Sequence, residues 1–230
     1  MFKQRISYKN IQLPGKSAYY LITGMFLGIS FFLLFCDLAE DMINREVALF
    51  DQTVTNILIG LRDPFTTEIM RLISDMSSPV IIISIAGIMV WFLFAVKKNS
   101  WDAFILLIAL TGAALLNWIL KWVFQRSRPD APSLAQAFGY SFPSGHAMIS
   151  FVFYGMLVYL LLVNFKRGKS TYLLTLFITF LILAIGISRI YLGVHYPSDV
   201  IAGYAAGGFW LTGCIMVHIK SEPLRANTLS

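Results

Sequence analysis

The chain has 230 residues, of which 57% are hydrophobic and only 13% are charged. A soluble domain carries about 25% charged residues, so this composition excludes a mainly water-facing surface and requires lipid around most of the chain. The formal net charge is +6, but the positions of these charges are more informative than their sum, and we expect no nucleic-acid partner. The length fits one domain, and we predict a single membrane domain over residues 1–230.

Six apolar segments are long enough to cross a bilayer, which takes about 20 mostly apolar residues in a helix. Shorter segments are accommodated by tilt and by local thinning of the bilayer. We therefore predict an all-α integral membrane protein, a bundle of six transmembrane helices. The predicted spans are roughly 18–36, 79–96, 103–120, 146–163, 172–188 and 199–219.

Between the first two spans, residues 37–78 are too polar to cross the membrane. Apolar residues recur at roughly helical spacing from Val47 to Leu61, which predicts a short amphipathic helix at the interface. Asp63-Pro64 indicates a break, and residues 65–74 a second short helix. We expect this interfacial segment to cap the bundle; the alternative is a gate through which lipid enters.

The basic residues in the connecting segments predict the orientation of the bundle. Lysines and arginines gather in the N-terminal segment, at Lys97-Lys98, at residues 166–169 and in the C-terminal tail. With six spans all of these lie on one side, which the positive-inside rule assigns to the cytoplasm. We expect a multi-pass protein of the cell membrane with both termini cytoplasmic, and the remaining loops on the extracytoplasmic side.

The first motif is Lys121-x6-Arg128-Pro129, at the end of the third span. If the helix continues, Lys121 and Arg128 share one face, two turns apart, before Pro129 stops the helix. Arginine suits bidentate phosphate binding and lysine a point contact. The alternative is that Lys121, Arg126 and Arg128 extend toward lipid headgroups.

The second motif is Pro143-Ser144-Gly145-His146, directly before the fourth span. Glycine allows backbone N–H groups to approach an anion, and a helix N-terminus adds unpaired donors and a positive dipole end. Ser144 and Gly145 can therefore hold phosphate oxygens, with His146 facing the same ligand. The alternative is a serine that only caps the helix.

The third motif is Ser188-Arg189-x5-His195-x3-Asp199. If His195 and Asp199 lie on one helical turn, the carboxylate reaches one ring nitrogen and leaves the other free as a nucleophile. Asp199 is also placed to cap the sixth span. Charged residues at a bilayer are costly unless paired, which favours a functional role for this motif.

Other residues invite structural interpretations. Asn117 in the third span indicates a helix–helix contact, and Gly203, Gly207 and Gly208 indicate close helix packing. His218, near the end of the sixth span, is interpreted as an interfacial residue.

The three motifs resemble the signature of the type 2 phosphatidic acid phosphatase family, also called the lipid phosphate phosphatase superfamily. That signature is KxxxxxxRP, PSGH and SRxxxxxHxxxD, and the chain matches it without departure within residues 79–219. The resemblance implies that His195 attacks phosphorus, Asp199 orients His195 and His146 protonates the leaving oxygen. It also implies that no metal or other cofactor takes part. The residues that it implies for phosphate binding are Lys121, Arg128, Ser144, Gly145 and Arg189.

The resemblance implies a membrane lipid phosphatase that acts at the outer membrane face on phosphatidylglycerol phosphate, phosphatidic acid or undecaprenyl diphosphate. Its partners would be this lipid substrate and the bilayer, with no obligatory protein partner. Within the same chemistry, a phosphotransferase or a hydrolase of soluble phosphoesters stays open. A membrane transporter that binds anions is the alternative from another class, but it predicts polar groups near the midplane rather than at one interface.

Overall fold

The computed structural model of the chain describes residues 14–164 and 168–226. In these ranges the backbone forms eight α-helices, and a π-helical turn, Phe92–Val96, continues the fourth. Six helical stretches in the described ranges are long and apolar enough to cross a membrane, which confirms the predicted all-α, six-span bundle. The helices are α1 (Pro14–Asn44), α2 (Ala48–Gly60), α3 (Pro64–Asp75), α4 (Pro79–Trp91), α5 (Ser100–Phe124), α6 (Gly145–Asn164), α7 (Lys169–Tyr191) and α8 (Pro197–Ala226).

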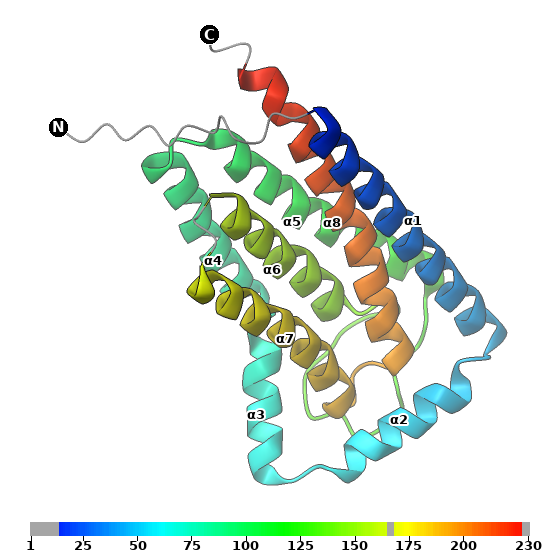
Figure 1. The fold of residues 1–230 in the computed structure, drawn as a ribbon. Helices are drawn as coiled ribbons and strands as arrows, with labels where there is room; N and C mark the ends of the chain where they lie inside the picture. Colours follow the sequence, from blue (N-terminus) through cyan, green and yellow to red (C-terminus); the bar gives the residue numbers. More distant parts are fainter. Residues whose placement is uncertain (1–13, 165–167, 227–230) are drawn as a thin grey trace.

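The long helices run side by side, and α2 lies across one end of the bundle (Figure 1). α8 packs against α1, α5 and α6, and α6 also contacts α5 and α7. We call the end crossed by α2 the motif end, because α5 and α7 finish there and α6 and α8 begin there. The chain connections thus bring all three sequence motifs to one end of the bundle.

Close approach of α8 to its neighbours depends on glycines. A β-carbon at Gly207 would lie 2.9 Å from the carbonyl oxygen of Met148 on α6, and one at Gly208 would lie 2.7 Å from the ring of Phe31 on α1. A β-carbon at Gly203 would lie 2.7 Å from the carbonyl oxygen of Ser144. These distances leave no room for a methyl group, so the predicted role of the three glycines in close packing is confirmed.

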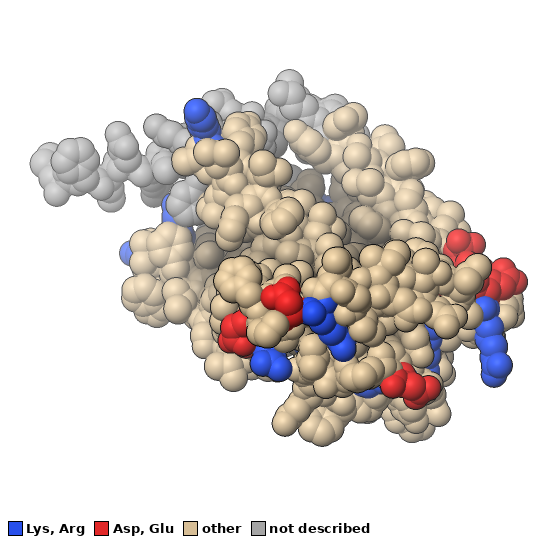
Figure 2. All heavy atoms as spheres, turned by 90° about the horizontal axis from the view of Figure 1, so that it is seen from below, with Lys and Arg blue, Asp and Glu red and all other residues tan. Residues whose placement is uncertain are grey.

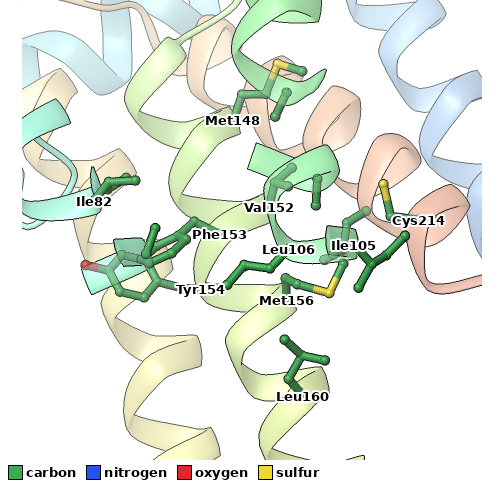
Figure 3. Packing of buried hydrophobic residues seen from close by; sticks show 14 of the residues in the cluster. Ile82, Ile105, Leu106, Met148, Val152, Phe153, Tyr154, Met156, Leu160 and Cys214 are labelled. Atoms are coloured by element: carbon green, nitrogen blue, oxygen red, sulfur yellow. The ribbon is translucent and has the colours of Figure 1, made fainter. Parts of the chain in front are cut away.

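Between the motif end and the opposite end of the bundle, the core is a continuous apolar cluster drawn from α4 to α8 (Figure 3). Leu106 on α5 and Met156 on α6 are fully buried in it, and Cys214 of α8 lies at its edge. Apolar side chains that face lipid cover much of the outside of the helices, among them Phe26, Phe177 and Phe180. The bundle is therefore packed inside and apolar outside, as a membrane domain requires.

The first helix is longer than the sequence indicated. We expected a span over roughly 18–36, but α1 continues as a helix to Asn44 and ends before Arg45, which has a φ of 65°. The polar residues Asp37 to Asp41 extend the helix beyond its apolar part, since only the membrane core requires apolar side chains. The following helices α2 and α3 confirm the two short helices predicted from Val47 onward.

His218 is not an interfacial residue as interpreted from the sequence. It is fully buried, and its Nε2 lies 2.8 Å from Oδ1 of Asp102 near the start of α5. Its Nδ1 lies 2.8 Å from the hydroxyl of Tyr159, and Asn164 donates to the other carboxylate oxygen of Asp102. This polar network joins α5, α6 and α8 at the end of the bundle opposite the motifs.

Candidate active site

The helix that carries Lys121 stops before Arg128. α5 ends at Phe124, and Gln125 adopts a left-handed conformation with a φ of 45°. The helix therefore does not continue from Lys121 to Arg128, and the condition for the two residues to share a helical face is not met. Lys121 lies in the last turn of α5, and Arg128 lies in the loop that follows. Lys121 donates to the backbone carbonyls of Tyr140 and Ser141, which lie near the end of the loop between α5 and α6.

Arg128 joins the two loops of the motif end. Its guanidinium donates to the carbonyls of Phe138 at 2.9 Å and Gly139 at 3.0 Å within its own loop. It also donates to the carbonyl of Val194, at 2.7 Å, in the connection between α7 and α8. The backbone thus fixes the position of this cation, and the alternative of a side chain extending freely to headgroups is wrong for Arg128.

The second motif forms the tight start of α6. The Ser144 hydroxyl accepts from the amide of Ala147 at 3.4 Å, so this serine does cap the helix, and its own amide donates to the Asp199 carbonyl at 2.9 Å. Asn117 of α5 contacts the turn: a β-carbon at Gly145 would lie 2.9 Å from its Oδ1. The glycine thus permits the approach of Asn117, which links α5 to α6 as predicted.

His195 and Asp199 come together although His195 lies outside the helix. α8 begins at Pro197, so Asp199 occupies its first turn and accepts from the backbone amide of Tyr196 at 2.9 Å. The same carboxylate oxygen lies 3.4 Å from Nδ1 of His195. Both side chains are buried, with 2% of His195 and none of Asp199 exposed. The proposed cap and the proposed orienting contact therefore coexist.

The contacts of the His195 ring indicate one tautomer. Nδ1 faces the carboxylate and carries the proton, whereas Nε2 lies 3.4 Å from Nη1 of Arg128, where an unprotonated nitrogen is favoured. Burial lowers the pKa of His195 to about 4; Asp199 opposes this shift, and the positive charges of Lys121 and Arg128 add to it. The imidazole is therefore neutral at pH 7, with a lone pair on the nitrogen beside a cation.

Arg189 and His146 complete the group. Arg189 is 4% exposed; it donates to the Ser74 hydroxyl on α3 at 2.5 Å, and its Nε has no hydrogen-bond partner among the described residues. His146 lies close enough to Arg189, His195, Arg128 and Lys121 for their charges to act on it. All the predicted site residues thus meet at the motif end.

The outer surface of this end is only sparsely charged. Figure 2 looks at it from below and shows acidic and basic side chains scattered among uncharged ones rather than gathered in one patch. A pocket of about 420 Å³ opens between the two loops, and Arg128, Gln136 and Gly193 contribute to its lining. The cations of the motifs lie largely beneath the surface, and Arg128 is the one that also lines this pocket.

Sequence reasoning missed two charged residues of the site. Arg126 was considered only as a side chain extending to headgroups, and Asp51 only as part of an amphipathic helix. In the structure they form an ion pair of 2.7 Å in which Asp51 is buried and Arg126 is partly exposed, and Arg126 also contacts Asp199 at 2.7 Å. No sequence signal joins the two residues, although Asp51 falls on the helical face that also carries Val47, Val54 and Leu58.

The chain is similar to known proteins in sequence and in fold. The family model described as the PAP2 superfamily matches residues 102–222. The chain is 31% identical to phosphatidylglycerophosphatase B of Bacillus subtilis (strain 168) over 192 residues, 80% of this chain and 90% of that one. It is 27% identical to an undecaprenyl-diphosphatase of Sulfolobus acidocaldarius over 218 residues, 90% of this chain and 93% of that one.

The fold comparison agrees with the family match. The crystal structure of a transmembrane PAP2 type phosphatidylglycerolphosphate phosphatase from Bacillus subtilis superposes with a TM-score of 0.80 at 28% identity. The match covers 85% of this chain and 97% of that chain. Fold, motifs and sequence similarity therefore lead to one conclusion: the chain belongs to the PAP2 superfamily.

Proposed function

We propose that this membrane phosphatase hydrolyses a lipid phosphate or diphosphate at the outer face of the membrane through a phosphohistidine on His195. The observation that carries the proposal is the environment of the His195 ring. Its Nδ1 faces Asp199 and its Nε2 faces Arg128, so a neutral, oriented nitrogen lies beside a fixed cation that attracts a phosphate. This is the base-and-orienter arrangement of nucleophilic catalysis.

The first chemical step forms a bond between Nε2 of His195 and phosphorus and breaks the bond between phosphorus and the leaving oxygen. His146 gives its proton to that oxygen, so the lipid product leaves as an alcohol or, from a diphosphate, as a monophosphate. In the second step His146 takes a proton from water, whose oxygen attacks phosphorus and breaks the phosphorus–nitrogen bond. Inorganic phosphate is released, and both histidines return to their starting state.

The phosphate would be bound by cations and hydrogen-bond donors of the protein. Arg189 offers its Nε, which has no hydrogen-bond partner within the described part of the chain, and Lys121 and Arg128 are held nearby by backbone carbonyls. The Ser144 hydroxyl and the Gly145 amide at the start of α6 add donors. Positive groups fixed in place stabilise a transferring phosphoryl group by electrostatics, so we propose that no metal ion is needed.

The lipid substrate is proposed from the relatives and from the position of the site. The Bacillus relative is named a phosphatidylglycerophosphatase and the Sulfolobus relative an undecaprenyl-diphosphatase, and both names describe lipid phosphates. In this chain the site lies at one end of six membrane-spanning stretches, where a headgroup reaches it while the tail stays in lipid. Lys97, Lys98 and Lys169 lie at the other end, which we assign to the cytoplasm together with both termini.

The test is phosphate release from the purified protein in detergent with EDTA present. Phosphatidylglycerol phosphate, phosphatidic acid, undecaprenyl diphosphate and glucose 6-phosphate are offered side by side. We expect release from at least one lipid and not from glucose 6-phosphate. Release from glucose 6-phosphate alone would overturn the lipid assignment, release from none would overturn the phosphatase proposal, and loss of activity in EDTA that Mg²⁺ restores would overturn the metal-free mechanism.

A further inference from the structure

Asp51 of α2 and Arg126 form an ion pair that joins this helix to the site; Asp51 is buried, and Arg126 is partly exposed. Asp51 lies on α2 with 1% of its surface exposed, and its Oδ2 is 2.7 Å from Nη2 of Arg126. Arg126 follows α5 in the loop that also carries Arg128. A helix that crosses the end of a bundle needs only apolar contacts to stay there, so a buried carboxylate on its inner face requires another explanation.

Arg126 also forms an ion pair with Asp199, the carboxylate that faces His195. The other terminal nitrogen of Arg126, Nη1, lies 2.7 Å from Oδ1 of Asp199. This is the carboxylate oxygen that does not face His195. The guanidinium also lies over the ring of Tyr196, 4.2 Å from its centroid. Arg126 therefore bridges two carboxylates, and each nitrogen of its fork is matched to one of them.

Ser198 closes the group on the α8 side. Its hydroxyl donates to Asp51 at 2.6 Å and accepts from Arg126 at 2.8 Å, and its backbone amide donates to Asp51 at 2.9 Å. Both oxygens of Asp51 are thus engaged by the first turn of α8, which also carries Asp199. The geometry fixes the carboxylate of Asp199 from the side opposite His195.

The charges of the group have a consequence for His195. Without Asp51, the positive charge of Arg126 would offset the negative charge of Asp199. Asp199 needs that negative charge to stabilise the positive charge that forms on the imidazole when His195 attacks phosphorus. Asp51 supplies a second negative charge, so the three side chains together carry the net charge of one carboxylate. Asp51 thereby offsets Arg126, and Arg126 prevents repulsion between the two acids.

We propose that Asp51 and Arg126 are positioning residues for the reaction, which hold Asp199 toward His195 and keep the negative charge behind the ring at one unit. This inference rests on the proposed function, because it assumes that His195 is the nucleophile. It makes α2 part of the active site rather than a passive cap. The two residues do not contact the reacting phosphate.

The experiment uses two substitutions that each remove a charge, Asp51→Asn and Arg126→Gln, and their double variant. Asp51→Asn keeps the size of the side chain, whereas Arg126→Gln shortens it and leaves a neutral amide in the site. Glu68→Gln on α3 removes an exposed carboxylate and is the matched control. Phosphate release gives kcat and KM, and NMR of ¹⁵N-labelled histidine gives the titration of His195 in the same detergent without substrate.

We expect each single substitution to lower kcat about 10- to 100-fold with a smaller change in KM, comparable to the loss when a residue that orients a metal ligand is replaced. The titration midpoint of His195 should shift in opposite directions, downward in Asp51→Asn and upward in Arg126→Gln, by about one pH unit. The double variant, which restores one net negative charge, should return toward the wild-type midpoint. Lys121 and Arg128, whose charges also act on His195, are unchanged in all three proteins.

A purely structural role predicts a different result, because loss of packing would not shift the His195 midpoint in opposite directions. Unchanged kcat in both single variants, or midpoints that stay at the wild-type value or move the same way, would overturn the inference. Failure of the proposed function is recognised separately, as wild-type phosphate release that is absent or does not depend on His195. The titration of His195 needs no substrate. It therefore tests the effect of the Asp51 and Arg126 charges on His195 whether or not the protein releases phosphate.

Discussion

Nη1 of Arg128 lies 3.4 Å from Nε2 of His195, the ring nitrogen opposite the one that faces Asp199. The imidazole is thus held between a carboxylate and a guanidinium, each of which favours the tautomer with its proton on Nδ1. Because Arg128 is fixed by backbone carbonyls of two loops, this relationship is built into the fold and precedes substrate binding. It leads to predictions about protonation and about the replacement of Arg128.

The imidazole of His195 should stay neutral down to about pH 4, because burial lowers its pKa more than Asp199 raises it. The folded pKa lies below the ordinary value of 6.5, so the related stability is complete above pH 6.5 and declines as the pH falls from there toward 4. NMR of ¹⁵N-labelled histidine measures this directly. The chain has three histidines, so His195→Gln identifies the signal. A midpoint near 6.5 would contradict the buried, neutral nucleophile.

Replacing Arg128 with lysine should lower kcat/KM by about 10²-fold, the effect of removing one fixed donor to a transition-state oxygen. Lysine keeps the charge but lacks the planar fork whose three nitrogens bond Phe138, Gly139 and Val194 separately, so the cation is no longer held in the same place beside His195. The control is Arg45→Lys in the turn between α1 and α2, where the side chain is exposed. Equal kinetics for Arg128→Lys and wild type would show that the fork geometry of Arg128 is not used.

His146→Ala should impair substrates with poor leaving groups far more than those with good ones. A lipid alkoxide needs a proton as it departs, whereas nitrophenolate leaves without one, so removal of the general acid affects the two unequally. Initial rates with phosphatidic acid and with nitrophenyl phosphate provide the comparison. If both rates fall by the same factor, His146 has a role other than proton donation.

Gly203→Ala should destabilise the protein by about 1–3 kcal/mol and reduce activity, as expected when a close-packed interface receives an extra methyl group. That methyl would lie 2.7 Å from the Ser144 carbonyl, so it displaces the turn that carries the second motif. Gly213→Ala on the same helix is the matched control, since nothing lies within 4 Å of a β-carbon there. Thermal unfolding in detergent and phosphate release check both effects, and equal behaviour of the two variants would contradict this packing account.

The helices and the motif residues were predictable because each leaves a local signal. Spans follow from runs of apolar residues, and the break before α3 follows from Asp63 and Pro64: the aspartate caps the helix by accepting from the amides of Phe65 and Thr66. The glycines of α8 likewise indicate close packing by their position within an apolar span. These features depend on neighbouring residues in the chain, which sequence reasoning can assess.

Contacts between distant segments were not predictable in the same way. Asp51 and Arg126 lie 75 residues apart, and nothing local distinguishes their ion pair from two separate surface charges. Similarly, Ser74 meets Arg189 only because α3 turns toward α7. The end of α5 before Arg128 was also missed, since a left-handed Gln125 is decided by the loop that follows rather than by the residue type.

The most direct test of the account is phosphate release from a lipid phosphate by wild type and His195→Gln, measured side by side in detergent with EDTA. We predict steady release by the wild type and a loss of about 10³-fold or more in the variant, the size expected when the nucleophile of a catalytic unit is removed. The thermal unfolding of the two proteins should be similar, which shows that the variant is folded. Phosphate release by a folded His195→Gln at the wild-type rate would contradict the central claim.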